Sequence, residues 1–324
     1  MTTGTCSLVG DIGGTNARFA LVHSGEVTPE DIETFRCRDY DNLDSAIADY
    51  LGRSGVKQVH SACLAVASPD QGTRVRMTNN HWHFDSETLR TQFGWDLFKV
   101  INDFTAMALG VPHVAADRLT YLCGGPGDAR RPKLVMGPGT GLGVSALLPS
   151  GQGQPGWLPL VTEGGHVDFA PTDDTDFAVL KILKSRFGRV SVERILSGQG
   201  LLNLYQAHAE IQGVTAALDV QEKITAAALN GSDGLAHQTL QHFCEILGRV
   251  AGNAVLTLGS TGGVYLCGGI LPGMINVLSQ GSFQRGFEDK GRMRPLLEST
   301  PVYVVTDGRT GLFGAAEALV NRAV

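Results

Sequence analysis

The sequence predicts an α/β fold in two domains. Short apolar runs of strand length alternate with longer stretches that have helical spacing. The pattern of strand, glycine turn and strand occurs twice, at residues 7–22 and 133–148. With 324 residues, the chain is also long for one compact domain. We therefore expect two related α/β halves that face each other across a cleft, a usual place for a small-molecule site.

The first half begins with a predicted β-hairpin. Its strands cover Ser7–Val9 and Arg18–Val22, and its turn is Gly10–Asn16. The other elements expected in this half are a helix over Asn42–Leu51, strands over Ser61–Ala67 and Lys99–Ile101, and a helix over Phe104–Leu109 that stops before Gly110 and Pro112.

The second half repeats this order. A strand over Lys133–Met136, a glycine turn over Gly137–Gly143 and a strand over Val144–Leu148 form its hairpin. The later predicted elements are helices over Thr175–Phe187, Gln199–Ala209, Glu222–Leu229 and Leu235–Leu256, a strand over Gly263–Cys267, a strand over Val302–Val305 and a helix over Gly311–Leu319.

Composition excludes several classes of protein. The net charge of -6 argues against a broad nucleic-acid surface. The six cysteines occur singly, without a C-x-x-C pair, which argues against structural zinc and fits a reducing compartment. Residues 1–5 lack the basic start of a signal peptide, and no apolar run is long enough to span a membrane. We expect a cytoplasmic protein without nucleic-acid or membrane partners.

The first glycine turn predicts a phosphate site. It lacks the G-x-G-x-x-G pattern and is followed by a strand, which argues against a dinucleotide fold. The backbone N–H groups of Gly13, Gly14 and Thr15 can instead point at phosphate oxygens. Asp11 beside them can hold Mg²⁺ through water, since Mg²⁺ prefers few carboxylates and phosphate oxygens. The alternative is a simple tight turn capped by Asp11.

Two more glycine segments support this hypothesis. Gly137–Gly143 lies between strands like the first turn, and two facing hairpins can hold a polyphosphate from both sides. Gly263–Ile270 is a strand that ends in Gly268 and Gly269, where a purine can lie against the backbone. The alternative for this pair is close packing between a helix and a strand.

These motifs resemble those of bacterial glucokinases, in the hexokinase–actin–Hsp70 superfamily. Gly10–Arg18 is similar to the first phosphate motif, Gly137–Gly143 to the second, and Gly263–Ile270 to the adenosine motif. The match continues through Ile101–Ala106, Glu163–Pro171 and Ser191–Gly198, in the expected order. The resemblance implies nucleotide contacts by Gly10, Asp11, Ile12, Gly13, Gly14, Thr15, Gly137, Thr140, Gly141, Gly268 and Gly269.

The resemblance also implies a sugar site. Asp103 would be the general base that accepts the proton of the glucose 6-hydroxyl as it attacks the γ-phosphate of ATP. Asn102, Glu163, His166 and Glu193 would bind the other hydroxyls, for which carboxylates and imidazole are suitable partners. The related repressor–kinase group carries a cysteine-rich zinc motif shortly after its Glu-x-Gly-His segment. Residues 168–191 of this chain contain no cysteine, so we interpret His166 as a sugar ligand and not a zinc ligand. The alternative for Asn102 or Asp103 is an N-cap of the following helix.

The implied fold is a duplicated ribonuclease-H-like core of the actin-like ATPase type. Its small domain would comprise residues 1–112 and 303–324, its large domain residues 113–302, and the family suggests a homodimer. The implied function is phosphorylation of D-glucose at the 6-hydroxyl by ATP and Mg²⁺. Another hexose, ADP or polyphosphate as donor, and an ATP-binding structural or sensing protein of the actin–Hsp70 type stay open as alternatives.

Overall fold

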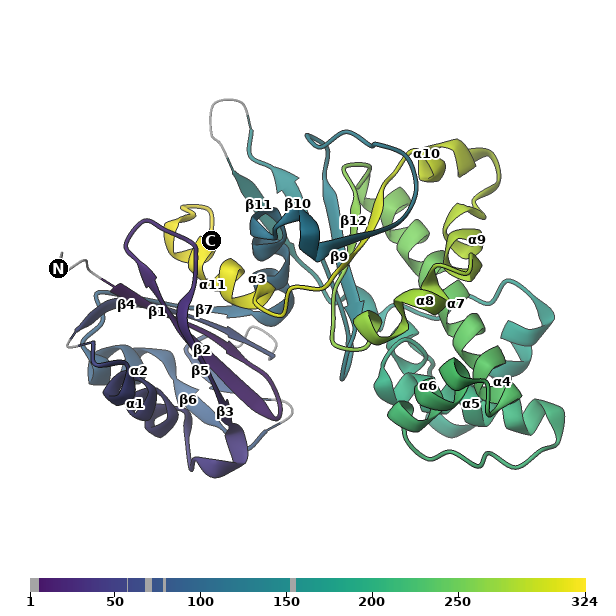
Figure 1. Ribbon diagram of the computed structural model, residues 1–324, viewed down its shortest axis with the longest axis horizontal. Coiled ribbons are helices and arrows are strands. Elements are labelled where there is room, and N and C mark those ends of the chain that lie inside the picture. Colours follow the sequence, from purple (N-terminus) through teal and green to yellow (C-terminus); the bar gives the residue numbers. More distant parts are fainter. Residues whose placement is uncertain (1–5, 57, 68–71, 78–79, 152–155) are drawn as a thin grey trace. The chain divides into compact units, whose positions relative to one another are not determined.

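The chain folds into two compact units. The structure is a computed structural model that describes residues 6–56, 58–67, 72–77, 80–151 and 156–324 (Figure 1). The first unit comprises Met1–Ala116, Leu147–Val161 and Asp307–Val324, and the second comprises Asp117–Ala146 and Thr162–Thr306.

These units differ from the expected division chiefly in one internal segment, and the expected boundaries at residues 112 and 303 each shift by four residues. We expected residues 147–161 in the large domain, but they belong to the first unit. Strand β11 (Trp157–Val161) packs against helix α3 (Asp103–Gly110), and the side-chain amide of Asn321 donates a hydrogen bond to the Trp157 carbonyl over 2.9 Å. These contacts join segments far apart in the chain, so no local pattern could predict them.

A five-stranded sheet organises the first unit. Its order is β3-β2-β1-β4-β7, with β1, β2 and β3 antiparallel and β4 and β7 parallel to β1. The predicted hairpin is confirmed, but β1 extends to Ile12, so Gly10 and Asp11 lie in the strand and the turn is only Gly13–Thr15. The bounds are β1 Cys6–Ile12, β2 Asn16–His23, β3 Glu30–Arg36, β4 Val59–Val66 and β7 Leu97–Asn102, and β5 (Arg74–Arg76) and β6 (His83–Asp85) form a separate small sheet.

Helices cover both faces of this sheet. Helices α1 (Leu43–Ser54) and α2 (Ser86–Phe93) lie against one face, and α3 and α11 (Thr310–Val320) against the other (Figure 1). Side chains alternate along a strand, so Leu8 and Ile12 of β1 enter the core on the α1 side. Asp11 therefore points to the opposite face, toward α11.

The second sheet repeats the strand order of the first. Its order is β11-β10-β9-β12-β13-β8, in which β9, β12 and β13 are parallel and β8 adds an antiparallel edge. Both sheets thus share a five-strand order in which the first strand of the hairpin is central. The bounds are β8 Leu119–Cys123, β9 Lys133–Pro138, β10 Leu142–Pro149, β12 Val264–Leu266 and β13 Val302–Val305.

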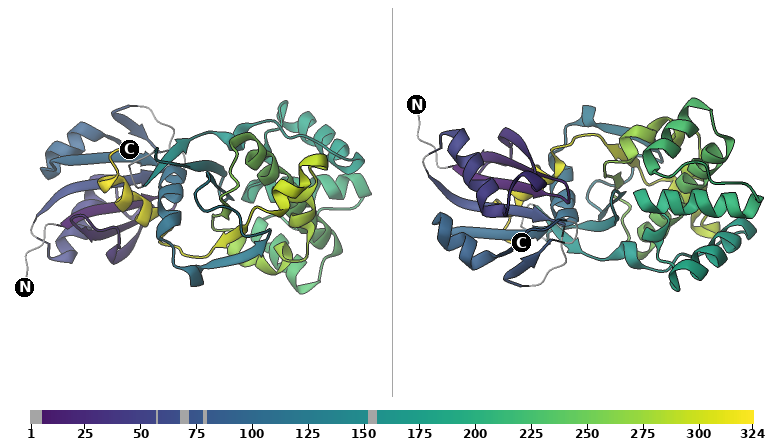
Figure 2. Two further views of the ribbon diagram at one scale, coloured as in Figure 1. Left: turned by 90° about the horizontal axis from the view of Figure 1, so that it is seen from above. Right: turned by 90° about the horizontal axis from the view of Figure 1, so that it is seen from below.

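The second unit carries most of the helices. The four long ones, drawn in teal and green, gather together in both views of Figure 2. The predicted helices are confirmed within a few residues, whereas the short α8, α9 and α10 were not predicted. The bounds are α4 Asp174–Phe187, α5 Gly198–Gln212, α6 Gln221–Asn230, α7 Gly234–Leu258, α8 Ile275–Leu278, α9 Ser282–Glu288 and α10 Arg294–Glu298. Short 3-10 helices cover Cys37–Asp39, Val111–His113, Ala116–Arg118, Gly164–His166, Val192–Arg194, Leu271–Met274 and Gly291–Met293.

Capping residues fix where the helices begin and end. The side chain of Ser197, for example, accepts the backbone N–H of Gly200 and starts α5, which ends at Gly213 in the left-handed conformation. A polar N-cap satisfies an N–H group that the helix leaves unpaired, and glycine adopts the left-handed end at little cost. Asn42, Asp85, Asn102, Asp173 and Asp233 cap other helices in the same way.

No helix in the described residues is long and apolar enough to cross a membrane.

A buried polar network lies among α4, α5 and α7. His208 contacts the Thr239 hydroxyl over 3.1 Å and His242 over 2.8 Å, and His242 reaches Asp176 over 2.8 Å. Arg249 forms an ion pair with the fully buried Asp176. Burial alone would raise the pKa of Asp176, but hydrogen bonds from His242 and Thr172 and the charge of Arg249 hold that pKa below its ordinary value. Burial, together with His242, lowers the pKa of His208 to about 4.

The pKa of His208 predicts a loss of stability in acid. Unfolded histidine takes up a proton near pH 6.5, whereas folded His208 does so only near pH 4. The free energy of unfolding should therefore fall by up to about 3 kcal/mol as the pH drops from about 6.5 to about 4. Urea unfolding across this range measures the effect. His208→Gln should reduce this pH dependence, whereas His237→Gln, at an exposed position, should not; equal profiles for both variants would contradict the assignment.

A second prediction concerns the contact between α3 and α11. A Cβ atom on Gly314 would overlap the carbonyl oxygen of Ala106, and one on Gly110 would overlap that of Thr310. Gly314→Ala should therefore lower the free energy of unfolding by about 3 kcal/mol. Gly52→Ala is the matched control because its Cβ meets open space in helix α1, and it should change stability by less than about 1 kcal/mol. Similar melting temperatures for the two variants would refute the close-contact argument.

Candidate functional site

The first glycine turn is shorter and more braced than expected. The backbone N–H of Gly13 donates to the Asn16 carbonyl over 2.9 Å, so in this structure it closes the turn, and its contact with phosphate stays a prediction. The amides of Gly14 and Thr15 are the other candidate donors of that hypothesis. The side chain of Asn80 donates to the Gly13 carbonyl over 3.1 Å, and the N–H of Cys37 donates to the Thr15 carbonyl over 2.9 Å.

Asp11 lies beside this turn, at the start of helix α11. Its carboxylate is 3.8 Å from the guanidinium of Arg18, its partner across β1 and β2, and a Cβ on Gly311 would lie 3.1 Å from it. Burial raises the pKa of Asp11 and the Arg18 charge opposes this. The side chain still keeps 27% of its surface exposed, so the carboxylate can reach a hydrated cation.

Asn102 and Asp103 lie where β7 ends and α3 begins. The side-chain oxygen of Asn102 accepts the N–H groups of Phe104 and Thr105 over 2.9 and 3.2 Å. Asn102 is thus the N-cap of α3, the structural role that we considered as the alternative. This bond uses the oxygen of the amide, whereas its nitrogen supplies two donors of the kind that bind hydroxyls. Asp103 follows in the first turn of α3, and its carboxylate accepts the N–H of Phe104 over 2.9 Å.

The second glycine turn is attached to Glu193. The carboxylate oxygen Oε2 of Glu193 accepts the backbone N–H of Leu142 over 2.8 Å, and a Cβ on Gly141 would lie 2.5 Å from that oxygen. The N–H of Gly198, at the start of α5, donates to the Gly139 carbonyl over 2.9 Å. A predicted sugar ligand and a predicted phosphate turn are therefore in direct contact within the second unit.

Glu163 and His166 belong to the same cluster. His166 lies 3.9 Å from a carboxylate oxygen of Glu163 through Nε2 and 3.9 Å from Oε1 of Glu193 through Nδ1. These distances are too long for hydrogen bonds, so the three side chains do not saturate one another. Between Glu163 and His166, Gly164 and Gly165 pack directly on β10, where a Cβ would collide with Val144 and with the Leu142 carbonyl.

Backbone pairing holds the two halves of this cluster together. The N–H of Val192 donates to the Val167 carbonyl over 2.9 Å, and that of Phe169 to the Val190 carbonyl over 3.0 Å. Arg189 also donates to the His166 carbonyl over 2.8 Å. The segment after His166 thus runs antiparallel to the segment before Glu193, which fixes both side chains on one scaffold.

Several predicted nucleotide residues have a structural reason to be glycine. Gly10 faces the core of its sheet, where a Cβ would lie 2.6 Å from Leu64. A Cβ on Gly137 would overlap the Cys267 carbonyl, and Gly268 has a φ of +101° and lies against the Pro138 carbonyl. Our alternative for this pair was a helix–strand contact, but Gly268 packs on the end of strand β9, so a strand–strand contact explains this glycine. A Cβ atom on Gly269 would meet no other atom, so the backbone of this residue is open to a ligand.

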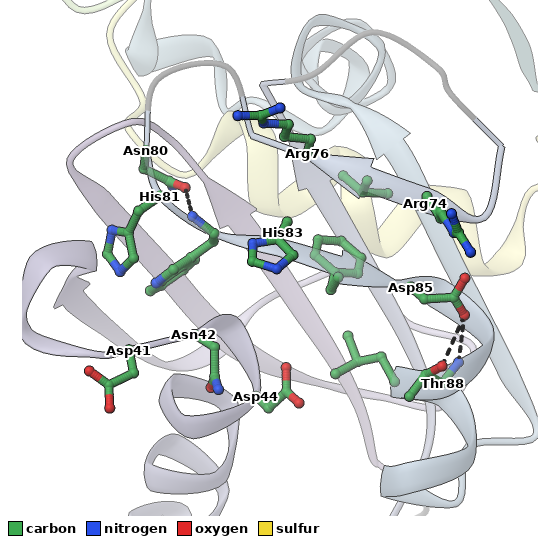
Figure 3. A pocket seen from close by; sticks show the side chains of 14 residues that line it. Asp41, Asn42, Asp44, Arg74, Arg76, Asn80, His81, His83, Asp85 and Thr88 are labelled. Carbon is green, nitrogen blue, oxygen red and sulfur yellow. Dashed lines mark hydrogen bonds between the residues drawn. The ribbon is translucent and has the colours of Figure 1, made fainter.

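A hollow of about 930 Å³ in the first unit was not predicted (Figure 3). It lies between the start of α1 and the β5–β6 hairpin, and His81 and His83 line it beside Asp41 and Asp44. None of our predicted site residues lines it, although Asn80, which braces Gly13, does. The sequence carries no local signal for this contact, because it joins residues 67 positions apart. Among the described residues, no group of three or more His, Cys, Asp or Glu side chains could hold a metal ion.

Comparison with known proteins gives the family. The family model described as glucokinase matches residues 8–322. The chain belongs to the glucokinase family. It is 68% identical to a glucokinase of Marinobacter nauticus over the full length of both chains. It therefore phosphorylates glucose with ATP.

The fold comparison agrees. A crystal structure of a glucokinase from an Antarctic psychrotroph has a TM-score of 0.88 and 36% identity, and the match covers 98% of this chain and 99% of that one. A glucokinase of the ROK family from Streptomyces griseus, solved with glucose and AMPPNP, has a TM-score of 0.64 at 18% identity, with 97% of this chain and 98% of that chain covered. At that identity the second match shows the fold alone.

The contact between Glu193 and the second glycine turn predicts a mutant phenotype. In Gly141→Ala the new Cβ would displace the Glu193 carboxylate, which the family resemblance implies is a glucose ligand. The affinity for glucose measured without nucleotide should therefore fall about tenfold or more, equivalent to at least ~1.4 kcal/mol. Gly139→Ala is the control in the same turn, because its Cβ meets open space. Calorimetric titration with glucose checks this, and equal affinities for both variants would contradict it.

Proposed function

We propose that this glucokinase transfers the γ-phosphoryl group of ATP to the 6-hydroxyl of D-glucose, with Asp103 as general base. The observation that carries the proposal is the cluster of Glu163, His166 and Glu193, which is bonded to the second glycine turn through Leu142. Polyol-binding side chains next to a phosphate-binding turn suit a sugar kinase. A structural or sensing ATP-binding protein has no use for such a cluster.

The chemistry relies on position more than on basicity. A carboxylate is a weak base at neutral pH, but phosphoryl transfer depends mainly on alignment and charge stabilisation. Asp103 stands at the first turn of α3, whose backbone is held by the Asn102 cap and by glycine contacts with α11. The carboxylate would orient the attacking hydroxyl and accept its proton. Asn102, Glu163, His166 and Glu193 would hold the remaining hydroxyls.

The nucleotide would be bound by the two glycine turns and by Gly268 and Gly269. A partly exposed carboxylate such as that of Asp11 fits Mg²⁺, which prefers few protein ligands plus water and phosphate oxygens. Asp11 would hold the ion through water, and the ion would neutralise charge on the β- and γ-phosphates. Membership of the glucokinase family supports ATP as the donor, and the Streptomyces griseus neighbour was solved with the ATP analogue AMPPNP.

The shared strand order of the two sheets supports a duplicated ribonuclease-H-like core as the origin of the fold. We also propose, from the family resemblance, that the protein acts in the cytoplasm as a homodimer.

The test of the proposal is a coupled assay for glucose 6-phosphate with ATP and Mg²⁺, run beside fructose, mannose and N-acetylglucosamine. Turnover confined to glucose would support it. A preference for another hexose would leave the proposed mechanism unchanged but identify that hexose as the substrate in place of glucose. Nucleotide binding without turnover of any sugar would refute it.

The role of Asp103 gives a sharper prediction. Asp103→Ala should lower kcat by about 100-fold or more while glucose still binds, because the base is lost but the other hydroxyl ligands remain. Asp103→Asn keeps an acceptor for the Phe104 N–H and serves as a control for folding. It should be as inactive as the alanine variant. If either variant kept more than a few per cent of the activity, Asp103 would not be the base.

A further inference from the structure

We propose that Glu193 couples the sugar site to the nucleotide site, so that each ligand tightens the binding of the other. This inference rests on the proposed function, in which Glu193 binds glucose and the second glycine turn binds phosphate. One carboxylate then serves two sites: Oε2 holds the turn and Oε1 faces His166.

The attachment to the turn is short and specific. The bond from the Leu142 N–H to Glu193 Oε2 is 2.8 Å long and joins residues 51 positions apart. Gly141 provides the space for the carboxylate, because a side chain there would displace it. Hydrogen bonds between a backbone N–H and an ionised carboxylate are stronger than neutral ones. The position of the turn therefore depends on the position of this carboxylate.

A second set of bonds ties the backbone near Glu193 to the same turn. The Ser197 hydroxyl donates to the Glu193 carbonyl over 2.8 Å, and the next residue, Gly198, donates its N–H to the Gly139 carbonyl over 2.9 Å. Both ends of the turn, at Gly139 and Leu142, are thus fixed to the segment 193–198. Glu163 differs, since its nearest ionic partner is His166 and it is largely exposed.

This arrangement predicts positive coupling. Oε2 of Glu193 is bonded to the turn, whereas Oε1 stands 3.9 Å from His166 Nδ1, too far for a hydrogen bond, so a glucose hydroxyl bonded to Oε1 would fix the carboxylate further. When glucose orders the carboxylate, the turn is ordered with it, and the nucleotide then meets a smaller entropic cost. Because coupling free energies are reciprocal, the nucleotide must tighten glucose binding by the same factor.

Calorimetry on the full chain tests this. Glucose affinity is measured with and without saturating AMPPNP and Mg²⁺, for the wild type, Glu193→Gln and Glu163→Gln. In the wild type, AMPPNP should tighten glucose binding about fivefold or more. Both variants should bind glucose more weakly. Only Glu193→Gln should lose the coupling, with a ratio of affinities below about twofold, because a neutral amide holds the Leu142 N–H less firmly. Melting temperatures confirm that the variants are folded.

The outcomes separate the inference from the proposed function. If Glu193→Gln keeps the wild-type ratio, or if both variants lose it equally, the coupling role of Glu193 is wrong even where turnover confirms a glucose kinase. A wild type that binds both ligands without any coupling would also overturn it. A wild type that binds no glucose would instead refute the proposed function itself.

Discussion

Backbone contacts that only glycine permits stabilise each of the two units internally. In the first unit, Gly314 lets α11 touch the α3 backbone at Ala106, and in the second, Gly165 lies against the Leu142 carbonyl and Gly137 against that of Cys267. Interiors are close-packed, so a single added methyl group at such points displaces backbone. The 42 glycines of the chain are therefore partly a packing requirement. The candidate site residues stand directly beside these contacts.

The candidate site carboxylates of the two units differ in what fixes them. Asp11 is placed by the alternation of strand β1 and the start of α11, and Asp103 by the first turn of α3. Glu193 is placed by a bond to a backbone N–H, and Glu163 by the glycines that follow it. Each lies at the end of a regular element and keeps some exposure, which suits groups that must meet a polar ligand.

The buried network around Asp176 shows the opposite use of charge. Asp176 is fully buried and bonded to His242, Arg249 and Thr172, so its negative charge is paired where α4 meets α7. A buried charge is tolerated only when it is paired and hydrogen-bonded. The exposed cluster of Glu163, His166 and Glu193 is not saturated in this way. The same residue types thus serve stability in one place and ligand binding in the other.

The sequence by itself determined both hairpins, the long helices of the second unit, the order of the motifs and the family, whereas several short elements such as β3, β8 and β11 were not predicted. Apolar periodicity, glycine turns and capping residues are local signals, so both hairpins and the long helices were predictable. The tertiary structure decided which side of β1 carries Asp11, that the Gly13 N–H closes its own turn, and that the Glu193 carboxylate accepts the Leu142 N–H. It also placed residues 147–161 with the first unit. These features depend on contacts between residues far apart in the chain, and such contacts leave no periodic pattern in the sequence.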